Sequence, residues 1–200
     1  MNSQRVAAII PAAGQSRRMG QPKLLLPWGQ TTVLGQVVGT FGEAGLGAIV
    51  IVTGAEREEV DELAAGLAEK YPVRCVHNAA YPTGGMLSSL QCGLAALGQE
   101  FEAALIGLGD QPQMESGTVR SILKAYETSK AGIIVPSYRM RRGHPWLVQR
   151  SLWDEIRALQ APLTLRDFLN THSDKIEYVP VGTPSILKDL DTPEDYACHP

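Results

Sequence analysis

The chain has 200 residues, of which 44% are hydrophobic and 20% charged, so it is long enough and apolar enough to bury a substantial core. Its net charge of −3 provides no overall basic field, and we expect no nucleic-acid or membrane partner. Three widely spaced cysteines indicate neither a disulfide framework nor a zinc site, and no signal-peptide pattern or membrane-length apolar run is evident. We therefore expect a soluble, cytoplasmic protein.

Short apolar runs alternate with helical patterns along the first two thirds of the chain. Runs typical of strands buried on both faces are residues 5–10, 47–52, 73–77, 102–108 and 131–136. Apolar residues at helical spacing predict helices over residues 34–41, 60–67, 87–97 and 119–126. This alternation predicts βαβ units, and hence a three-layer α/β/α fold with a mostly parallel, Rossmann-like sheet.

After residue 137 the pattern changes. Residues 138–149 predict a turn followed by an extended segment, and two short helices are expected over 151–159 and 164–172. Late strands are predicted at 175–181 and 185–190, and a last helix begins with Thr192 as N-cap and Pro193 at the first helical position. We expect one domain over residues 1–200, with a core at 1–136 and an elaboration on the sheet edge at 137–200.

The stretch "PAAGQSRRMGQPKLLLPW", residues 11–28, follows the first predicted strand. Gly14 and Gly20 allow the backbone to approach a ligand closely, and Arg17, Arg18 and Lys23 supply charged donors. Ligands of doubly wound folds bind at such loops, so the stretch predicts a phosphate site, with a solvated basic turn as the alternative. Its spacing matches neither the Walker A loop nor the dinucleotide fingerprint.

Two aspartates are placed to hold a metal ion. Asp110 follows the strand predicted at 102–108, and Asp191 lies between a predicted strand and a helix start, next to Asp189. A triphosphate needs charge neutralisation, and Mg²⁺ held by one or two carboxylates is the usual agent. The alternative is that Asp110 is a turn residue and that Asp189 or Asp191 is a helix cap.

The stretch at 11–28 resembles the signature L-A-A-G-x-S-x-R-M-G-x-x-K of nucleotidyltransferases of the sugar-nucleotide type, with Pro11 as the one departure. Among these it is similar to the molybdenum cofactor cytidylyltransferases, and "GDQP" and "DLDTPEDY" resemble family motifs too. The resemblance implies transfer of CMP from CTP to the molybdopterin phosphate of molybdenum cofactor, with release of pyrophosphate. It implies that Ala12, Ala13 and Gly14 favour CTP.

The same resemblance assigns roles to individual residues. Lys23, Arg18 and Asp110 are implied to be catalytic, and Asp110 and Asp191 to bind Mg²⁺. The segment 77–94 resembles the family stretch that lines the nucleotide site, which implies nucleotide contacts for Asn78, Gly84, Gly85 and Ser89. A glycine turn and a helix-capping serine remain an open alternative there.

The segment "RMRRGHPWLV" resembles a family segment that faces the pterin-bearing substrate. It implies that Arg141, Arg142 and His144 contact the acceptor phosphate, that Trp146 packs near a flat ring, and that Arg166 is a further acceptor residue. Residues 158–169 depart from the family, whose members usually have a Gly-Asp-x-Gly-x-Arg-like stretch there.

Other functions remain open at this point. One is the same chemistry on guanylyl donors, or on a sugar-phosphate or alditol-phosphate acceptor. Another is a non-catalytic carrier of molybdenum cofactor or a maturation chaperone, and a third is an oxidoreductase built on the same scaffold. The expected partners are CTP or another nucleoside triphosphate, molybdenum cofactor and a molybdoenzyme client.

Overall fold

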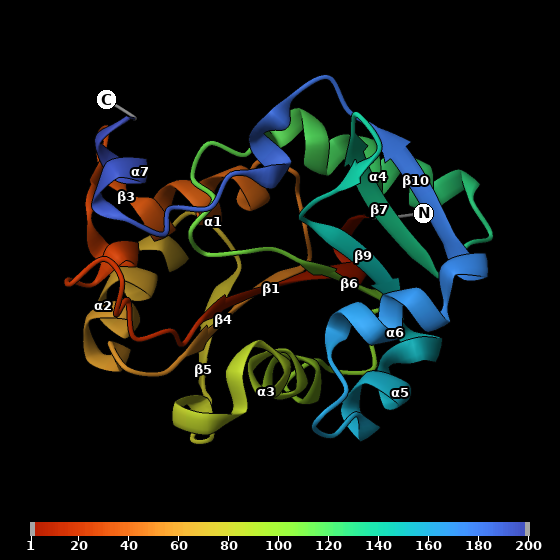
Figure 1. The fold of residues 1–200 in the computed structure, drawn as a ribbon, viewed down its shortest axis with the longest axis horizontal. Helices are drawn as coiled ribbons and strands as arrows, with labels where there is room; N and C mark the ends of the chain where they lie inside the picture. Colours follow the sequence, from red (N-terminus) through yellow and green to blue (C-terminus); the bar gives the residue numbers. More distant parts are fainter. Residues whose placement is uncertain (1–2, 199–200) are drawn as a thin grey trace.

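The computed structural model describes residues 3–198, and Figure 1 shows a central sheet with helices on both of its faces. Across these residues the sheet has eight strands, in the order β10-β7-β9-β6-β1-β4-β5 with β8 paired to β7. The strands of this sheet are β1 (Val6–Ala12), β4 (Ala48–Thr53), β5 (Val73–His77), β6 (Ala103–Ile106), β7 (Ile133–Tyr138), β8 (Arg141–Arg142), β9 (Trp146–Gln149) and β10 (Ile176–Pro180). A separate two-stranded ribbon pairs β2 (Pro27–Trp28) with β3 (Thr31–Thr32).

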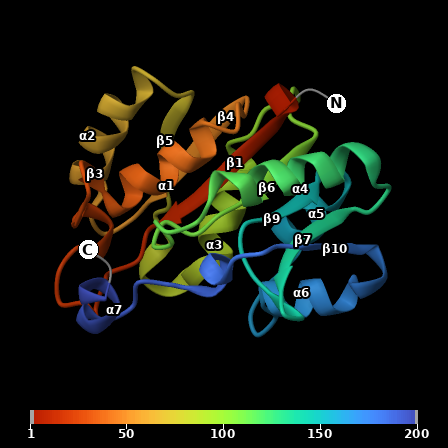
Figure 2. The ribbon, with the colours of Figure 1, turned by 90° about the horizontal axis from the view of Figure 1, so that it is seen from above.

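Seven α-helices are described within residues 3–198, and they divide between the two faces of the sheet. They are α1 (Val33–Gly42), α2 (Arg57–Ala68), α3 (Tyr81–Ala95), α4 (Ser116–Thr128), α5 (Trp153–Ala158), α6 (Leu165–Thr171) and α7 (Pro193–Ala197). Short 3₁₀ turns are η1 (Ser3–Arg5), η2 (Lys23–Leu25), η3 (Arg150–Leu152), η4 (Ser173–Lys175) and η5 (Pro184–Leu187). Figure 2 shows α1 and α4 neighbouring each other over one face, and α3, α5 and α6 belong to the opposite layer.

Strand β1 shows how the sequence produces these two layers. Its side chains alternate between the faces, so Val6, Ala8 and Ile10 pack in the core beneath α1, α2 and α4. Ala7 and Ile9 pack in the second core, beneath α3, α5 and α6. Full burial of one such isoleucine stabilises the fold by about 1.5–3 kcal/mol. The strand must therefore be apolar on both faces, which is why it reads as an uninterrupted apolar run.

The parallel strands bring loops from distant parts of the chain to one edge of the sheet. β1 pairs in parallel with both β4 and β6, so the loops that follow these strands leave the sheet on the same side. Gly54, just after β4, allows the loop after β1 to pack closely, because a Cβ there would lie 2.6 Å from the Ala13 carbonyl oxygen. The residues at 11–23 and the residues that follow β6 therefore become neighbours.

Most of the predicted elements are confirmed, including the strands of the first two thirds, the four long helices and the helix start at Thr192, whose hydroxyl accepts from the Asp195 backbone N–H. Of the segment 137–200, expected at the sheet edge, β10 is the edge strand of the sheet, whereas β9 runs antiparallel between β6 and β7 in the sheet interior. The strand predicted at 185–190 is wrong. Pro184 and the capping side chain of Thr183 start the 3₁₀ turn η5 there instead.

No helix within residues 3–198 is both long enough and apolar enough to cross a membrane.

Candidate functional site

The loop after β1 contains two residues in the left-handed backbone region, Ser16 at φ +46° and Gly20 at φ +72°. The backbone N–H groups of Met19 and Gly20 both donate to the Ser16 carbonyl, at 3.0 and 3.1 Å, which closes a tight turn. The Ser16 hydroxyl then accepts from the backbone N–H of Lys23 at 3.1 Å. This turn positions the Lys23 side chain at the sheet edge where β1 ends.

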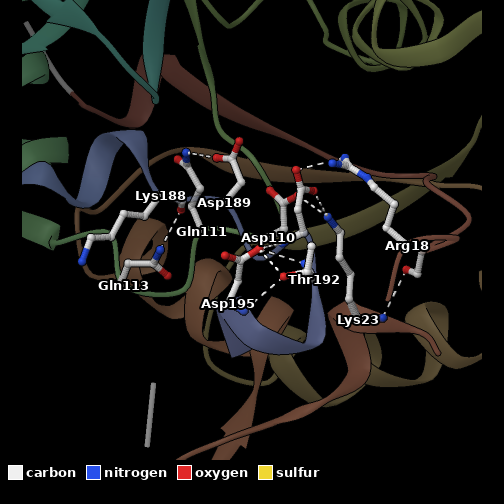
Figure 3. Close-up of polar contacts among 11 residues, drawn as sticks. Arg18, Lys23, Asp110, Gln111, Gln113, Lys188, Asp189, Thr192 and Asp195 are labelled. Carbon is white, nitrogen blue, oxygen red and sulfur yellow. Dashed lines mark hydrogen bonds and ion pairs between the residues drawn. The ribbon is translucent and has the colours of Figure 1, made fainter. Parts of the chain in front are cut away.

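Two cations of this loop meet two carboxylates from distant segments (Figure 3). Figure 3 shows Lys23 pointing at Asp110, and Lys23 Nζ lies 2.5 Å from Asp110 Oδ2. The same Nζ lies 3.2 Å from Asp191 Oδ1. An Arg18 guanidinium nitrogen lies 2.9 Å from Asp191 Oδ2. The side chains of Lys23 and Asp110 are 16% and 19% exposed, whereas that of Arg18 is 70% exposed. Solvent therefore screens the Lys23–Asp110 pair much less than the contact of Arg18.

Burial and opposite charge compete at the central pair. Burial by itself lowers the pKa of Lys23, but the charges and hydrogen bonds of Asp110 and Asp191 outweigh it, and the pKa is raised. Burial raises the pKa of Asp110, and the neighbouring Lys23 charge offsets this only in part. A carboxylate that is poorly solvated in this way is stabilised in its ionised form by any further cation at the site. The Asp110 carboxylate is therefore suited to bind a further cation.

Two glutamines after β6 hold the segment that precedes α7 against this site (Figure 3). Gln111 Nε2 donates to Asp189 Oδ1 at 2.7 Å, and Gln113 Nε2 donates to the backbone carbonyl of Lys188 at 2.7 Å. We call these two contacts the glutamine latch. Gln111 is only 1% exposed, so its bond to the carboxylate forms where water competes little.

Backbone hydrogen bonds complete the attachment. The Leu190 N–H donates to the Asp110 carbonyl at 3.0 Å. The Asp195 carboxylate, in the first turn of α7, accepts from the backbone N–H groups of Asp191 and Thr192 at 3.1 and 2.9 Å. Because these bonds fix the backbone on either side of Asp191, its carboxylate is directed at Lys23 and Arg18 rather than left on a free loop.

These groups surround a cavity of about 350 Å³, which we call the loop cavity. Most of the nucleotide and metal residues predicted from the sequence line it. They are Ala12, Ala13, Gly14, Arg18, Lys23, Gly85, Ser89, Asp110 and Asp191. The cavity thus combines the loop after β1 with two cations and with the carboxylates of Asp110 and Asp191, at the carboxyl ends of β1 and β6.

Four predicted nucleotide residues do not line the loop cavity. Arg17 is exposed and bonds to a glutamine side chain two residues before it, and Gly20 serves the tight turn of the loop. Asn78 is 4% exposed, and its Nδ2 donates to the hydroxyls of Ser88 and Ser89 at 2.9 and 3.2 Å. Asn78 therefore orients Ser89 from behind the cavity wall. Gly84 lines a neighbouring cavity instead.

The loop cavity also contains residues that the sequence-based assignment left out or left uncertain. Ser16 lies inside the glycine-rich signature, and Tyr81 and Met86 flank the glycine pair that breaks α3 at Gly85, where φ is +57°. Asp189 lines the cavity too, as the uncertain neighbour of the predicted metal residue. The signature position of Ser16 is the one sequence signal that points to it.

A second cavity, of about 580 Å³, adjoins the first, and we call it the arginine cavity. All of the predicted acceptor residues line it, namely Arg141, Arg142, His144, Trp146 and Arg166. Met86 and Leu108 line both the arginine cavity and the loop cavity, so the two share a wall. A molecule in one cavity is therefore next to a molecule in the other.

The arginine cavity combines two exposed arginines with a neutral imidazole ring. Arg141 and Arg142 form the exposed strand β8, and Arg142 donates to Asn170 Oδ1 at 3.3 Å. The His144 backbone N–H donates to the Ile186 carbonyl at 3.1 Å, which holds this residue in the wall. Burial lowers the pKa of His144 to about 4, although the charge of Asp110 works against this. The imidazole is therefore neutral at pH 7.

The oxygen donors of the loop cavity fit a divalent cation that arrives with phosphate groups. Within residues 3–198 no three His, Cys, Asp or Glu side chains are grouped so as to hold a metal ion unaided. Asp110 and Asp191 nevertheless present oxygens to the same ammonium group, so positive charge is already accommodated between them. Mg²⁺ is typically held by one or two carboxylates, with phosphate and water oxygens as its other ligands.

A mostly parallel α/β sheet with this loop and these carboxylates at its carboxyl edge defines a protein that binds a nucleotide polyphosphate. Residues 8–176 match the MobA-like NTP transferase domain. The chain belongs to the MobA-like NTP transferase family and is a nucleotidyltransferase, which confirms the family expected from the sequence.

Two relatives of known activity match almost the whole chain. The chain is 30% identical to the molybdenum cofactor cytidylyltransferase of Escherichia coli (strain K12), with 96% of this chain and 93% of the relative covered. It is also 30% identical to nicotine blue oxidoreductase of Paenarthrobacter nicotinovorans, with 94% and 93% covered. Identity alone therefore does not separate these two relatives.

A solved structure supports the fold and the class of cofactor. Rv0371c of Mycobacterium tuberculosis H37Rv superimposes with a TM-score of 0.83 at 27% identity, covering 99% of this chain and 98% of the other. The same protein is also known as a complex with manganese, which matches this chain at a TM-score of 0.77 over 97% of its length and 96% of the other. A divalent cation in a protein of this fold agrees with the cofactor class expected here, and magnesium itself remains a prediction.

Proposed function

We propose that the protein transfers CMP from CTP to the terminal phosphate of molybdopterin in molybdenum cofactor and releases pyrophosphate, with Mg²⁺ as the cofactor. The observation that carries the proposal is the contact of Lys23 and Arg18 with Asp110 and Asp191 in the loop cavity. Two cations beside two carboxylates can bind a triphosphate and its metal ion together. The 30% identity to the molybdenum cofactor cytidylyltransferase of Escherichia coli supports the choice of donor and acceptor.

Each residue of the loop cavity has a separate task in this proposal. Lys23 and Arg18 leave their carboxylate partners and donate to oxygens of the triphosphate, which orients the α-phosphorus and stabilises the charge on the departing pyrophosphate. Asp110 and Asp191 hold Mg²⁺, which supplies charge neutralisation when it is bound. Ala13 and Gly14 line the same cavity, and in this proposal their backbone N–H groups donate to phosphate oxygens.

The acceptor needs orientation more than activation. A phosphate oxygen is already ionised at neutral pH, so no general base is required for its attack on the α-phosphorus. Arg141 and Arg142 bind the acceptor phosphate in the arginine cavity, next to the shared wall. The neutral His144 ring can donate or accept one hydrogen bond without adding charge. A molybdoenzyme client for the product is a further part of the proposal.

A two-stage experiment tests this function. Calorimetry with CTP, GTP, ATP and UTP, each with and without Mg²⁺, should show tightest binding for CTP and a requirement for the metal ion. Pyrophosphate release should then appear when CTP and molybdenum cofactor are supplied together, and neither alone should support it. Tighter binding of GTP than of CTP would indicate a guanylyltransferase instead. Binding of molybdenum cofactor without a metal requirement and without turnover would indicate a non-catalytic carrier of that cofactor.

An oxidoreductase is a second candidate, favoured by the 30% identity to nicotine blue oxidoreductase. The paired cations and carboxylates of the loop cavity favour the transferase, because binding a polyphosphate with a metal ion explains all four side chains at once. Oxidation of NADH or NADPH in the presence of quinone-like dyes is the discriminating assay. Turnover there, with no pyrophosphate released from any nucleotide, would replace the proposed function.

A further inference from the structure

A third cavity, of about 830 Å³, is larger than either cavity described so far, and we call it the α3 cavity. It lies between the first half of α3 and the loop at 159–164 that joins α5 to α6. Half of its lining residues are apolar, namely Met86, Leu87, Leu159, Ala161, Pro162, Leu163 and Leu165. Arg166 is the one charged residue in its lining, all of which lies in the described part of the chain.

Hydrogen bonds fix the walls of the α3 cavity without any ligand. Gln91 Nε2, on α3, lies 3.0–3.2 Å from three backbone carbonyls in the last turn of α5 and just after it, among which its two N–H groups are shared. At the other end of the loop, the Thr164 hydroxyl accepts from the Asp167 backbone N–H and the Asp167 carboxylate accepts from the Thr164 backbone N–H, which starts α6. The loop is therefore held at both ends, and a ligand pays little ordering entropy to bind there.

The α3 cavity adjoins the two cavities of the proposed reaction. Met86, Leu165 and Arg166 line both it and the arginine cavity, and Met86 lines the loop cavity as well. Exposed apolar side chains gather at the same place. Across residues 3–198, three of the four large apolar side chains recorded as exposed line these cavities, namely Met86 (44%), Leu163 (52%) and Met140 (96%).

Apolar surface that stays in water beside a preformed cavity is typical of a ligand-binding site. At the tip of the loop that lines the α3 cavity, Leu163 is exposed to solvent. A polar residue at such an exposed position would destabilise the fold little, so folding alone does not require a leucine there. None of the cavity's lining residues, all within the described range 3–198, is acidic, so the lining itself adds no negative charge against an anionic ligand. The cavity therefore suits an uncharged body attached to an anion that the arginines bind.

We propose that the α3 cavity is a second acceptor subsite, which binds a large uncharged ring system or chain attached to the acceptor phosphate. This inference rests on the proposed function, because it takes the phosphate to occupy the arginine cavity. Arg166, at the wall shared by both cavities, marks the junction between the phosphate and the uncharged part. The subsite selects acceptors by the bulk of what they carry beyond the phosphate, so it discriminates against a small alditol phosphate.

The test compares two substitutions at the exposed loop tip. Leu163→Gln removes the apolar contact without adding charge, and Leu163→Met is the matched control that keeps it. Direct calorimetry with molybdenum cofactor, in the absence of nucleotide, should show affinity weakened about five- to tenfold in Leu163→Gln and changed less than about twofold in Leu163→Met. Affinities for CTP with Mg²⁺ and for glycerol 3-phosphate should be unchanged in both variants.

The outcomes separate this inference from the proposed function. Equal cofactor affinity in Leu163→Gln and the unmodified chain overturns the subsite, even if CMP transfer proceeds normally. Failure of the unmodified chain to bind CTP counts against the proposed function, whereas the cofactor-binding comparison still decides the subsite. A defect in Leu163→Gln that appears only with a molybdoenzyme, and not with free cofactor, assigns the surface to protein docking and overturns the small-molecule subsite.

Discussion

In the loop cavity the cations Lys23 and Arg18 are paired with carboxylates, whereas none of the residues described as lining the neighbouring arginine cavity, all within 3–198, is acidic. The first arrangement holds its geometry without a ligand, because each charge already has a partner. The second presents Arg141 and Arg142 on an exposed two-residue strand, where a bound anion would be the partner.

This difference separates two kinds of binding. In the proposed reaction, a metal–triphosphate complex in the loop cavity would exchange partners with the existing ion pairs of Lys23, Arg18, Asp110 and Asp191. Its binding energy would then be directed to the charges that change during the reaction. In the arginine cavity an anion adds contacts that did not exist before. We therefore expect substitutions in the loop cavity to impair turnover, and substitutions in the arginine cavity to impair acceptor affinity.

The largest effect is expected from Asp110→Asn. The substitution keeps the shape of the side chain but removes the charge that balances Lys23 and that would hold Mg²⁺, so turnover should fall by about 100- to 1,000-fold. Rates of pyrophosphate release at saturating CTP measure the effect, with thermal unfolding as the check on folding. Asp154→Asn, at a 92% exposed position on α5, is the matched control and should leave turnover unchanged. Retained activity in Asp110→Asn would contradict the metal role.

A smaller effect, and one of a different kind, is expected from the double substitution Arg141→Gln and Arg142→Gln. Loss of two exposed charge-assisted donors should raise KM for the acceptor by about tenfold and leave the affinity for CTP unaltered. Arg139→Gln, two residues away on the same hairpin and outside the arginine cavity, is the control. A fall in kcat with no change in acceptor KM would show that the two cavities are not divided in this way.

The same contrast explains which parts of the site the sequence could predict. Asp110 follows the buried strand β6 closely, and Lys23 lies in the loop that leaves the buried strand β1. Parallel pairing brings the ends of these strands to one edge, so local motifs were enough to place both residues. The inner position of β9 depends on antiparallel pairing with β6 and β7, which no local pattern specifies. Met86, which lines all three cavities, lies within the segment 77–94 that resembles the family stretch, but the sequence assigned it no role because an exposed methionine on a helix is ordinary.

The glutamine latch gives a third and smaller test, because it acts on the loop cavity only through the position of Asp189 and its neighbours. Gln111→Leu removes a hydrogen bond to a carboxylate from a nearly fully buried side chain, so unfolding should become easier by about 1–2 kcal/mol. Affinity for CTP with Mn²⁺ should weaken about three- to tenfold, because Asp191 becomes less well fixed.

The matched comparison for the latch is Asp189→Asn, which keeps an acceptor oxygen for Gln111 but removes the charge. If the latch acts by position, this variant should lose less stability than Gln111→Leu. Manganese titration followed by electron paramagnetic resonance reports the metal affinity without relying on turnover. Lower stability of Gln111→Leu with unaltered manganese affinity would reduce the latch to a structural contact.

The smallest effect on activity, and a measurable one on stability, concerns His144. Its folded-state pKa of about 4 lies below the usual value of 6.5, so between these pH values the unfolded chain binds more protons than the folded one. The contribution of His144 to the free energy of unfolding is therefore fully present above pH 6.5 and is lost as the pH falls toward 4. The free energy of unfolding changes by at most about 1.4 kcal/mol per pH unit on account of this group. Activity should not change between pH 7 and 8 on account of this ring.

Urea unfolding of the wild type and of His144→Gln across pH 4.5–7.5 isolates this contribution. Asp110 has a raised pKa, so its own contribution falls as pH rises and partly opposes that of His144 in the wild type. The difference between the two proteins removes most of that opposing slope, because Asp110 is present in both. The wild type should lose more stability than the variant on acidification. Parallel curves would mean that the ring in the arginine cavity titrates as it does in water, and that the wall it forms is wetter than its burial indicates.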